Sequence, residues 1–153
     1  MGIVPDSASH ISAPARDTLS SMATIFSKII AREIPAEIIY EDEHTLVIPD
    51  KFPSMEGQVL VISRREVPYI FDLEEPEYRA LMETTKKVVA ALDTVFKSIR
   101  TCVVIEGFEV PHVHIRLYPC PTEALILSPR REASDEELRD IASRVRAALA
   151  TKN

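Results

Sequence analysis

Apolar residues recur every three or four positions, the helical period, in three segments of this chain. The first, residues 25–33, is short and is stopped by Pro35. The second, residues 75–98, carries an apolar stripe that runs from Tyr78 to Ile99. The third begins after Ser134, a predicted N-cap with Glu137 three residues later in the capping-box pattern. Its expected buried face is Leu138, Ile141, Ala142, Val145 and Leu149.

Other segments have the composition and alternation of β-strands. Residues 37–41 and 45–49 are separated by a polar turn, which predicts a hairpin. Residues 58–63 are almost wholly apolar and predict a central strand, after a loop over 51–57. Two further strands, 101–106 and 110–118, are joined through Gly107. Because strands and helices are segregated along the chain, we predict an α+β fold with a mainly antiparallel sheet.

With 153 residues, 46% of them hydrophobic and 27% charged, the chain is long enough for one domain with a core. We assign this domain to residues 22–153. Residues 1–21, rich in Ser, Ala and Pro, are interpreted as a disordered leader or extension. No apolar run reaches the length of a membrane span, so no membrane partner is expected.

Charge and composition restrict the partners further. The net charge of −6 argues against nucleic acid, because neutralising a phosphate backbone requires a basic surface, whereas a small phosphorylated ligand requires only local positive charge. The three glycines form no Gly-rich phosphate loop, and no cofactor is expected. Cys102 and Cys120 form neither a zinc pattern nor a disulfide framework, which favours a reducing, cytoplasmic compartment.

The most informative segment is Pro-His-Val-His-Ile-Arg-Leu-Tyr-Pro at residues 111–119. In a strand, successive side chains point to opposite faces, so His112, His114 and Arg116 are predicted to share one face. Two titratable imidazoles beside a permanent cation suit an anion such as phosphate.

Three explanations of this polar face stay open. The first is a half-exposed edge strand whose histidines have no chemical role. The second is a metal site, for which a third ligand is missing and Arg116 stands in the next position on the same face. The third is nucleophilic attack on phosphorus by an imidazole, with cationic donors around the phosphate oxygens. His114, between His112 and Arg116, suits the nucleophile.

This segment resembles the motif His-φ-His-φ-His-φ-φ of the histidine triad (HIT) family, where φ is apolar, with Arg116 in place of the third histidine. Residues 25–35, 40–50 and 57–63 resemble the opening helix, first hairpin and central strand of the family. The resemblance covers residues 22 to about 119 and is closest to the Hint-like and bacterial hydrolase branch. It implies a five-stranded antiparallel sheet, usually in a homodimer whose sheets join.

The resemblance also implies a site for a purine nucleotide. By motif position His114 matches the nucleophile, His112 an orienting partner, and Asp50 the acidic residue that binds the ribose hydroxyls. The residues that match the apolar purine pocket are Ile25, Phe26, Ile29 and Ile48, for which plain core packing is the alternative. We also assign Glu109 and Val110 to the expected nucleotide-binding residues.

Four positions depart from the family pattern. Arg116 replaces a histidine and cannot transfer a proton, although it can grip phosphate oxygens. Ile105, Glu109 and Glu66 stand where the family often has asparagine, a small hydroxyl residue and a further histidine. Since an unpaired Glu109 would oppose phosphate binding, we hypothesise an ion pair between Glu109 and Arg116.

The predicted function is hydrolysis or transfer at the 5′-phosphoryl group of a purine nucleotide conjugate, of the phosphoramidate or dinucleotide polyphosphate type. His114 attacks phosphorus, His112 holds it, and Arg116 stabilises charge. The alternative is a nucleotide-binding or interaction module whose altered triad has little or no activity. A structural homodimer with a vestigial pocket is a third possibility.

Overall fold

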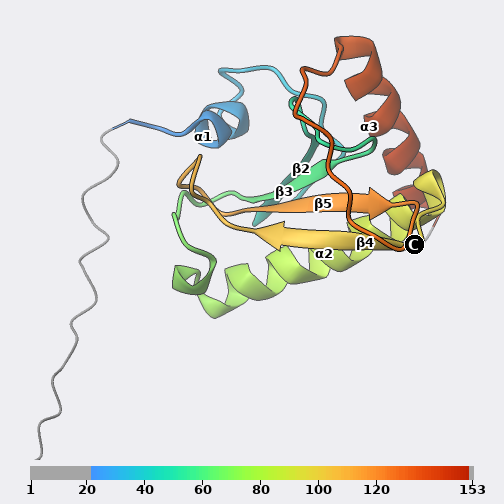
Figure 1. The fold of residues 1–153 in the computed structure, drawn as a ribbon. Coiled ribbons are helices and arrows are strands. Elements are labelled where there is room, and N and C mark those ends of the chain that lie inside the picture. The colour runs from blue at the N-terminus through green and yellow to red at the C-terminus, as the bar shows by residue number, and fades with distance from the viewer. Residues whose placement is uncertain (1–21, 152–153) are drawn as a thin grey trace, which may run out of the picture.

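The computed structural model describes residues 22–151 and confirms the α+β fold (Figure 1). Five strands form one antiparallel sheet in the order β1-β2-β3-β5-β4. The strands are β1 (Tyr40–Glu41), β2 (Thr45–Pro49), β3 (Val59–Ser63), β4 (Arg100–Ile105) and β5 (His114–Cys120). The helices are α1 (Ile25–Ile30), the 3-10 turn η1 (Ile70–Asp72), α2 (Glu75–Phe96) and α3 (Asp135–Ala150).

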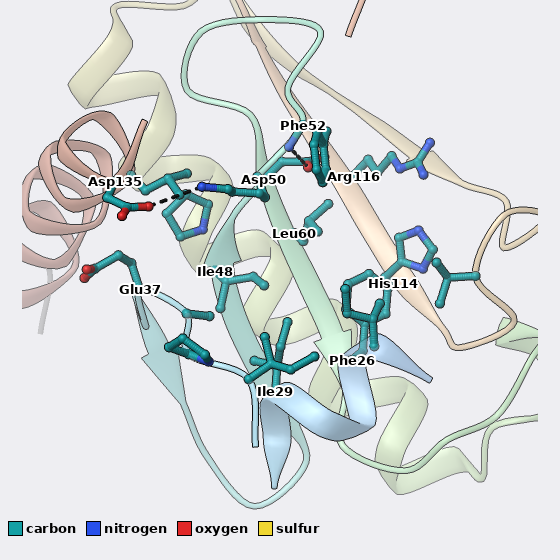
Figure 2. A pocket seen from close by; sticks show the side chains of 18 of the residues that line it. Phe26, Ile29, Glu37, Ile48, Asp50, Phe52, Leu60, His114, Arg116 and Asp135 are labelled. Atoms are coloured by element: carbon teal, nitrogen blue, oxygen red, sulfur yellow. Dashed lines mark hydrogen bonds and ion pairs between the residues drawn. The ribbon is translucent and has the colours of Figure 1, made fainter. Parts of the chain in front are cut away.

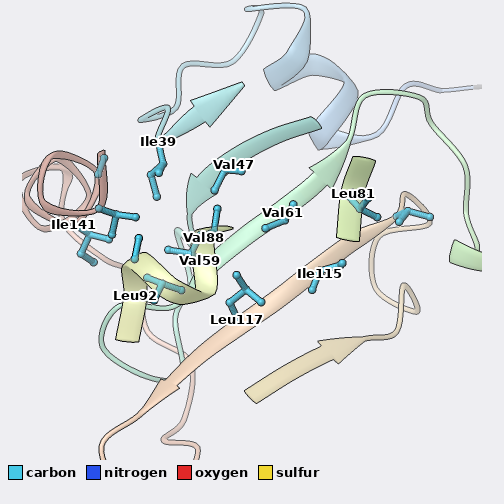
Figure 3. Packing of buried hydrophobic residues seen from close by; sticks show 14 of the residues in the cluster. Ile39, Val47, Val59, Val61, Leu81, Val88, Leu92, Ile115, Leu117 and Ile141 are labelled. Atoms are coloured by element: carbon cyan, nitrogen blue, oxygen red, sulfur yellow. The ribbon is translucent and has the colours of Figure 1, made fainter. Parts of the chain in front are cut away.

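Each face of the sheet has its own apolar cluster. On one face, the strand residues Val47, Val61 and Ile115 pack with α2 and α3 (Figure 3). On the other face, α1 packs Phe26 and Ile29 against a second set of strand residues: Leu46, Ile48, Leu60 and Ile62. The central strands are therefore apolar on both faces, which explains their uninterrupted hydrophobic sequences. In the part of the chain that the structure describes, no helix is long and apolar enough to cross a membrane.

Two predicted boundaries near the histidine motif are wrong. The helix α1 ends at Ile30, before the predicted residue 33, because the backbone turns into a left-handed conformation at Arg32, with φ of 64°. The strand β5 begins at His114, four residues later than predicted. Residues ahead of it follow another course: the His112 amide donates to the Val110 carbonyl at 2.8 Å in a tight turn.

The other predicted elements need smaller corrections. Only Tyr40 and Glu41 of residues 37–41 form strand, and η1 was not predicted. The long helix ends at Phe96, so Ile99 lies beyond it and is 58% exposed. Ser134 caps α3 as predicted, and its Oγ accepts from the Glu137 amide at 3.1 Å.

The capping box predicted at α3 lacks its second half, because Glu137 binds Arg131 instead. The predicted buried face of α3 is correct for four residues, while Leu149 is only partly buried. The leader assigned to residues 1–21 lies outside the described residues.

Candidate active site

A cavity of about 590 Å³ opens on the α1 face of the sheet and has His114 in its wall (Figure 2). His114 and Arg116 lie on β5 opposite Ile62 and Leu60 of β3, and all four face α1 rather than α2. The next residues of β5, Ile115 and Leu117, belong to the core cluster on the other face. The predicted alternation along the strand is therefore present from His114 onward.

The imidazole of His114 is held by its own strand. Its Nδ1 atom lies 2.7 Å from the carbonyl oxygen of His112. A carbonyl only accepts, so Nδ1 carries the proton and the lone pair is on Nε2. Phe26 covers the ring, with centroids 4.9 Å apart. Burial lowers the pKa of His114, and the positive charge of Arg116 lowers it further. The result is a fixed, neutral imidazole.

His112 lies behind this wall and does not line the cavity. It is fully buried, and its Nε2 donates to the Ser63 carbonyl at 2.6 Å. Its Nδ1 therefore accepts, and the Thr24 hydroxyl donates to it at 2.8 Å. Burial lowers the pKa of His112 as well. His112 therefore contacts His114 through its backbone carbonyl, while its own ring is hydrogen-bonded to Ser63 and Thr24.

A polar cluster that the sequence did not reveal surrounds His112. Thr24 is also the N-cap of α1 and accepts from the Ser27 amide at 3.2 Å. Glu66 accepts from the Thr24 amide at 3.1 Å and from the Ser27 hydroxyl. The N-terminus of α1 is thereby tied to the histidine motif. The available signals were the Thr-Ile-Phe-Ser start of the short helix and the position of Glu66, where the family often has a histidine.

Asp50 forms another buried part of the wall, at the end of β2. Its Oδ1 accepts from the Phe52 amide at 2.8 Å, and its Oδ2 accepts from the Gln58 side chain at 2.5 Å. Figure 2 shows it on the same cavity as His114. Each carboxylate oxygen keeps a further lone pair, so Asp50 can still accept from a ligand hydroxyl.

The predicted apolar residues all line this cavity: Ile25, Phe26, Ile29, Ile48 and Val110. Phe26, Ile29 and Ile48 also belong to the core cluster on this face, so these side chains pack in the core and line the cavity at once. Leu60 completes the apolar wall. This wall is mainly aliphatic, with the aromatic ring of Phe26, and apolar walls of this kind are typical of small-molecule sites.

Charged side chains gather at the end of the cavity where Arg116 lies. Arg116 Nη1 lies 3.1 Å from Glu106 Oε1, and Arg116 Nη2 lies 3.4 Å from Glu109 Oε2. The hypothesised contact of Glu109 with Arg116 is thus present, but each has a closer partner. For Glu109 it is Arg130, at 2.7 Å. Sequence reasoning missed Glu106 and Arg130, because the connections that carry them, between β4 and β5 and before α3, have no periodic pattern.

The opposite end of the cavity is also charged, with Glu37, Lys51, Asp135 and Arg139 in its lining. Lys51 and Asp135 form an ion pair at 3.2 Å. None of these residues was predicted.

Across residues 22–151 there is no group of three or more His, Cys, Asp or Glu side chains arranged to hold a metal. Cys102 and Cys120 are free thiols with sulfur atoms 3.5 Å apart.

Fold and site together define an α+β domain with a cavity at one face of its sheet and His114 in the cavity wall. Residues 31–120 match the HIT domain family, more than half of the chain. The chain therefore belongs to the histidine triad (HIT) family, as its motif indicated.

Individual relatives agree with this assignment. The chain is 32% identical over 100 residues to the purine nucleoside phosphoramidase of Escherichia coli, covering 61% of this chain and 84% of that protein. It is 32% identical over 99 residues to a HIT-like protein of Methanocaldococcus jannaschii, covering 62% and 77%. The crystal structure of a Bartonella henselae HIT-like protein superposes with a TM-score of 0.76 and 25% identity, over 82% of this chain and 95% of that chain.

Proposed function

We propose that this protein hydrolyses, or transfers, the nucleoside 5′-phosphoryl group of purine nucleotide conjugates, with His114 as nucleophile. The observation that carries the proposal is the orientation of His114. Its Nδ1 is occupied by the His112 carbonyl, which leaves a neutral Nε2 at the wall of a cavity that also holds Asp50. The similarity to a purine nucleoside phosphoramidase supports the choice of substrate class.

The proposed reaction has two displacements at phosphorus. First, His114 Nε2 forms a bond to phosphorus while the bond from phosphorus to the leaving nitrogen or oxygen breaks, and the leaving group takes a proton from water. Water, or another acceptor, then forms a bond to phosphorus as the bond to His114 breaks, and the proton that this acceptor loses passes to solvent, which balances the proton taken up by the leaving group. Arg116 stabilises the phosphate oxygens but transfers no proton, because a guanidinium stays charged. His112 is a positioning residue.

Binding is assigned to the rest of the cavity. Asp50 accepts hydrogen bonds from the ribose hydroxyls, and the base lies against the apolar wall of Ile25, Phe26, Ile29 and Ile48. The nearby Val110 extends this wall. Glu109 faces the phosphate end, where its charge is offset by arginine. The pattern of an apolar cavity with a few placed polar groups suits a small ligand rather than nucleic acid.

We also propose that the protein is a homodimer, joined along β4, and that it resides in the cytoplasm. β4 is one of the two outer strands of the sheet, and its Val103 and Ile105 are exposed. Exposed apolar residues on an open strand edge favour pairing with a second copy. Light scattering on the wild type and on Val103→Lys tests this: the proposal expects a dimer and a monomer, respectively, and a monomeric wild type contradicts it. The proposed cytoplasmic location is supported by the two free thiols, Cys102 and Cys120, which suit a reducing compartment.

Trapping of a covalent intermediate tests the proposed activity. The protein is mixed with adenosine 5′-phosphoramidate, quenched within a turnover and analysed by mass spectrometry. We expect an adenylyl adduct on His114, absent from His114→Ala and present in His44→Ala, a matched change at a histidine outside the cavity. Absence of both the adduct and AMP formation from the wild type contradicts hydrolysis.

A binding module is the second candidate function. The observation that favours it is Arg116, a residue without acid–base chemistry at the third triad position, held by Glu106 and Glu109. Protection against thermal unfolding by AMP without adduct or turnover favours this module. No shift of the melting temperature with AMP, and no turnover, points to a structural dimer with a vestigial pocket.

A further inference from the structure

One carboxylate, that of Glu109, lies between two arginines at the edge of the cavity. Its Oε2 atom is 2.7 Å from Arg130 Nη1 and 3.4 Å from Arg116 Nη2. All three side chains line the cavity beside His114. Paired guanidinium groups around one carboxylate are the arrangement with which proteins bind the anionic group of a ligand. Glu109 stands where such a group would bind.

Both arginines are anchored independently of Glu109. The Arg116 side chain is only 17% exposed, and its other nitrogen, Nη1, binds Glu106 at 3.1 Å. Arg130 donates from Nε to the Phe52 carbonyl at 3.2 Å, and its guanidinium lies 5.9 Å from the centroid of the Phe52 ring. Removal of the Glu109 carboxylate therefore leaves both guanidinium groups in place.

Glu109 itself is the exposed member of the group. Its side chain is 57% exposed and extends from the connection between β4 and β5, next to the almost fully exposed Phe108. The hydrogen bond from Arg130 lowers the pKa of Glu109, so the carboxylate is charged at neutral pH and competes with any anionic ligand.

The charges also balance only while Glu109 is in place. Two positive groups, Arg116 and Arg130, face two negative ones, Glu106 and Glu109. When Glu109 rotates away, one positive charge is left uncompensated at the cavity edge. An incoming phosphate or carboxylate then restores the balance and takes over the contacts of Glu109.

We infer that Arg116 and Arg130 form a binding site for a second anionic group of the ligand, one that belongs to the leaving group, and that Glu109 occupies this site until the ligand replaces it. The inference rests on the proposed function, which places the reacting phosphoryl group at His114. A guanidinium carries five N–H donors, so Arg116 can contact both groups. The substrates are then nucleotide conjugates whose leaving group is itself negatively charged.

Calorimetry with two ligands tests the site without turnover. AMP has no second anionic group, whereas α,β-methylene-ADP has one and cannot be cleaved between its phosphorus atoms. We expect the wild type to prefer the diphosphate, and Arg130→Gln to lose about tenfold of that preference, which corresponds to one charge-assisted hydrogen bond. Glu109→Gln removes the competing carboxylate and is expected to increase the preference.

Arg131→Gln is the matched control. Arg131 is the neighbour of Arg130 and loses the same charge on substitution, but it binds Glu137 and does not line the cavity. Its preference is expected to equal that of the wild type. If AMP binds and Arg130→Gln changes the preference no more than Arg131→Gln does, the second anionic group is not a phosphate, and the proposed function stands. If neither ligand binds the wild type, the proposed function fails as well.

The leaving group could present either a phosphate or a carboxylate, and kinetics separates the two. Adenosine phosphoramidates of glycine and of glycinamide differ only in the charged carboxylate. A higher kcat/KM for the glycine conjugate that Arg130→Gln abolishes supports the site with carboxylate as the group. A preference confined to the diphosphate ligand supports it with phosphate. The absence of a preference in both comparisons overturns the inference.

Discussion

The Nδ1 atom of His114 lies 2.7 Å from the backbone carbonyl oxygen of His112. This contact joins two residues of the motif through the main chain, so it survives a change in the His112 side chain that leaves the backbone in place. It fixes both the tautomer and the direction of the His114 ring. The reactive nitrogen is then determined by geometry, because Nε2 alone retains a lone pair.

His114→Ala removes that nitrogen but leaves the apolar wall and Asp50. We expect the turnover of adenosine 5′-phosphoramidate to fall by about 10³-fold or more, as expected when a covalent nucleophile is lost. AMP affinity is expected to change by less than about tenfold, because the nucleophile adds little to ground-state binding. Product analysis by chromatography and calorimetry with AMP provide the two measurements. Unchanged turnover removes His114 from the nucleophile role.

Asp50→Asn tests the assignment of the ribose. The amide keeps the size of the side chain but loses one acceptor oxygen and the negative charge, so hydrogen bonds from ligand hydroxyls weaken. We expect AMP to bind about tenfold more weakly, a change of about 1.4 kcal/mol.

A ligand without the hydroxyls separates this effect from a general disturbance of the cavity. The wild type is expected to bind 2′,3′-dideoxy-AMP more weakly than AMP, and Asp50→Asn is expected to bind both alike. The two affinities, measured by calorimetry for each protein, form a double-mutant cycle. If the substitution weakens both ligands by the same factor, Asp50 does not contact the ribose.

Thr24→Val is expected to destabilise the protein through two separate contacts. The substitution removes the N-cap acceptor of α1, worth about 1 kcal/mol. It also removes the donor to His112 Nδ1 and leaves a buried nitrogen unsatisfied, which costs a further ~2 kcal/mol. Urea unfolding measures the sum. Thr24→Ser keeps the hydroxyl and is expected to stay within about 1 kcal/mol of the wild type. Equal losses for Val and Ser would assign the effect to packing.

Much of the fold was predictable because the apolar periods are long and uninterrupted. The stripe along α2 and the apolar strand β3 specify a helix on a sheet without further information. The boundaries were less predictable, since they depend on tertiary contacts. β5 starts at His114 because Val113 donates to the Val67 carbonyl and its own carbonyl accepts from Ser63, contacts that no local pattern encodes.

The site divides in the same way. The alternation of residues 114–117 predicts which side chains face α1, and the cavity contains His114, Arg116 and Asp50. Some other members of the cavity come from segments without regular structure. Arg130 is held by the carbonyl of Phe52, so its position follows from the folded chain alone. The same is true of Glu66, which lies outside the cavity lining and is held by the N-terminus of α1.

Protonation of the two histidines is expected to weaken both activity and stability as the pH falls. Burial lowers the pKa of His112 and of His114 below the ordinary value of about 6.5. Between about pH 6.5 and those lowered values the unfolded chain binds protons that the folded chain does not. The free energy of unfolding therefore decreases as the pH falls through this range, and it has its full value above this range.

Turnover is expected to be level above about pH 7 and to fall with the titration of His114, since a protonated imidazole has no lone pair for phosphorus. NMR titration of the ring signals measures both pKa values, and urea unfolding at several pH values measures the slope. His112→Gln is expected to reduce that slope. Ring signals that titrate at or above about 6.5 contradict a neutral, buried pair.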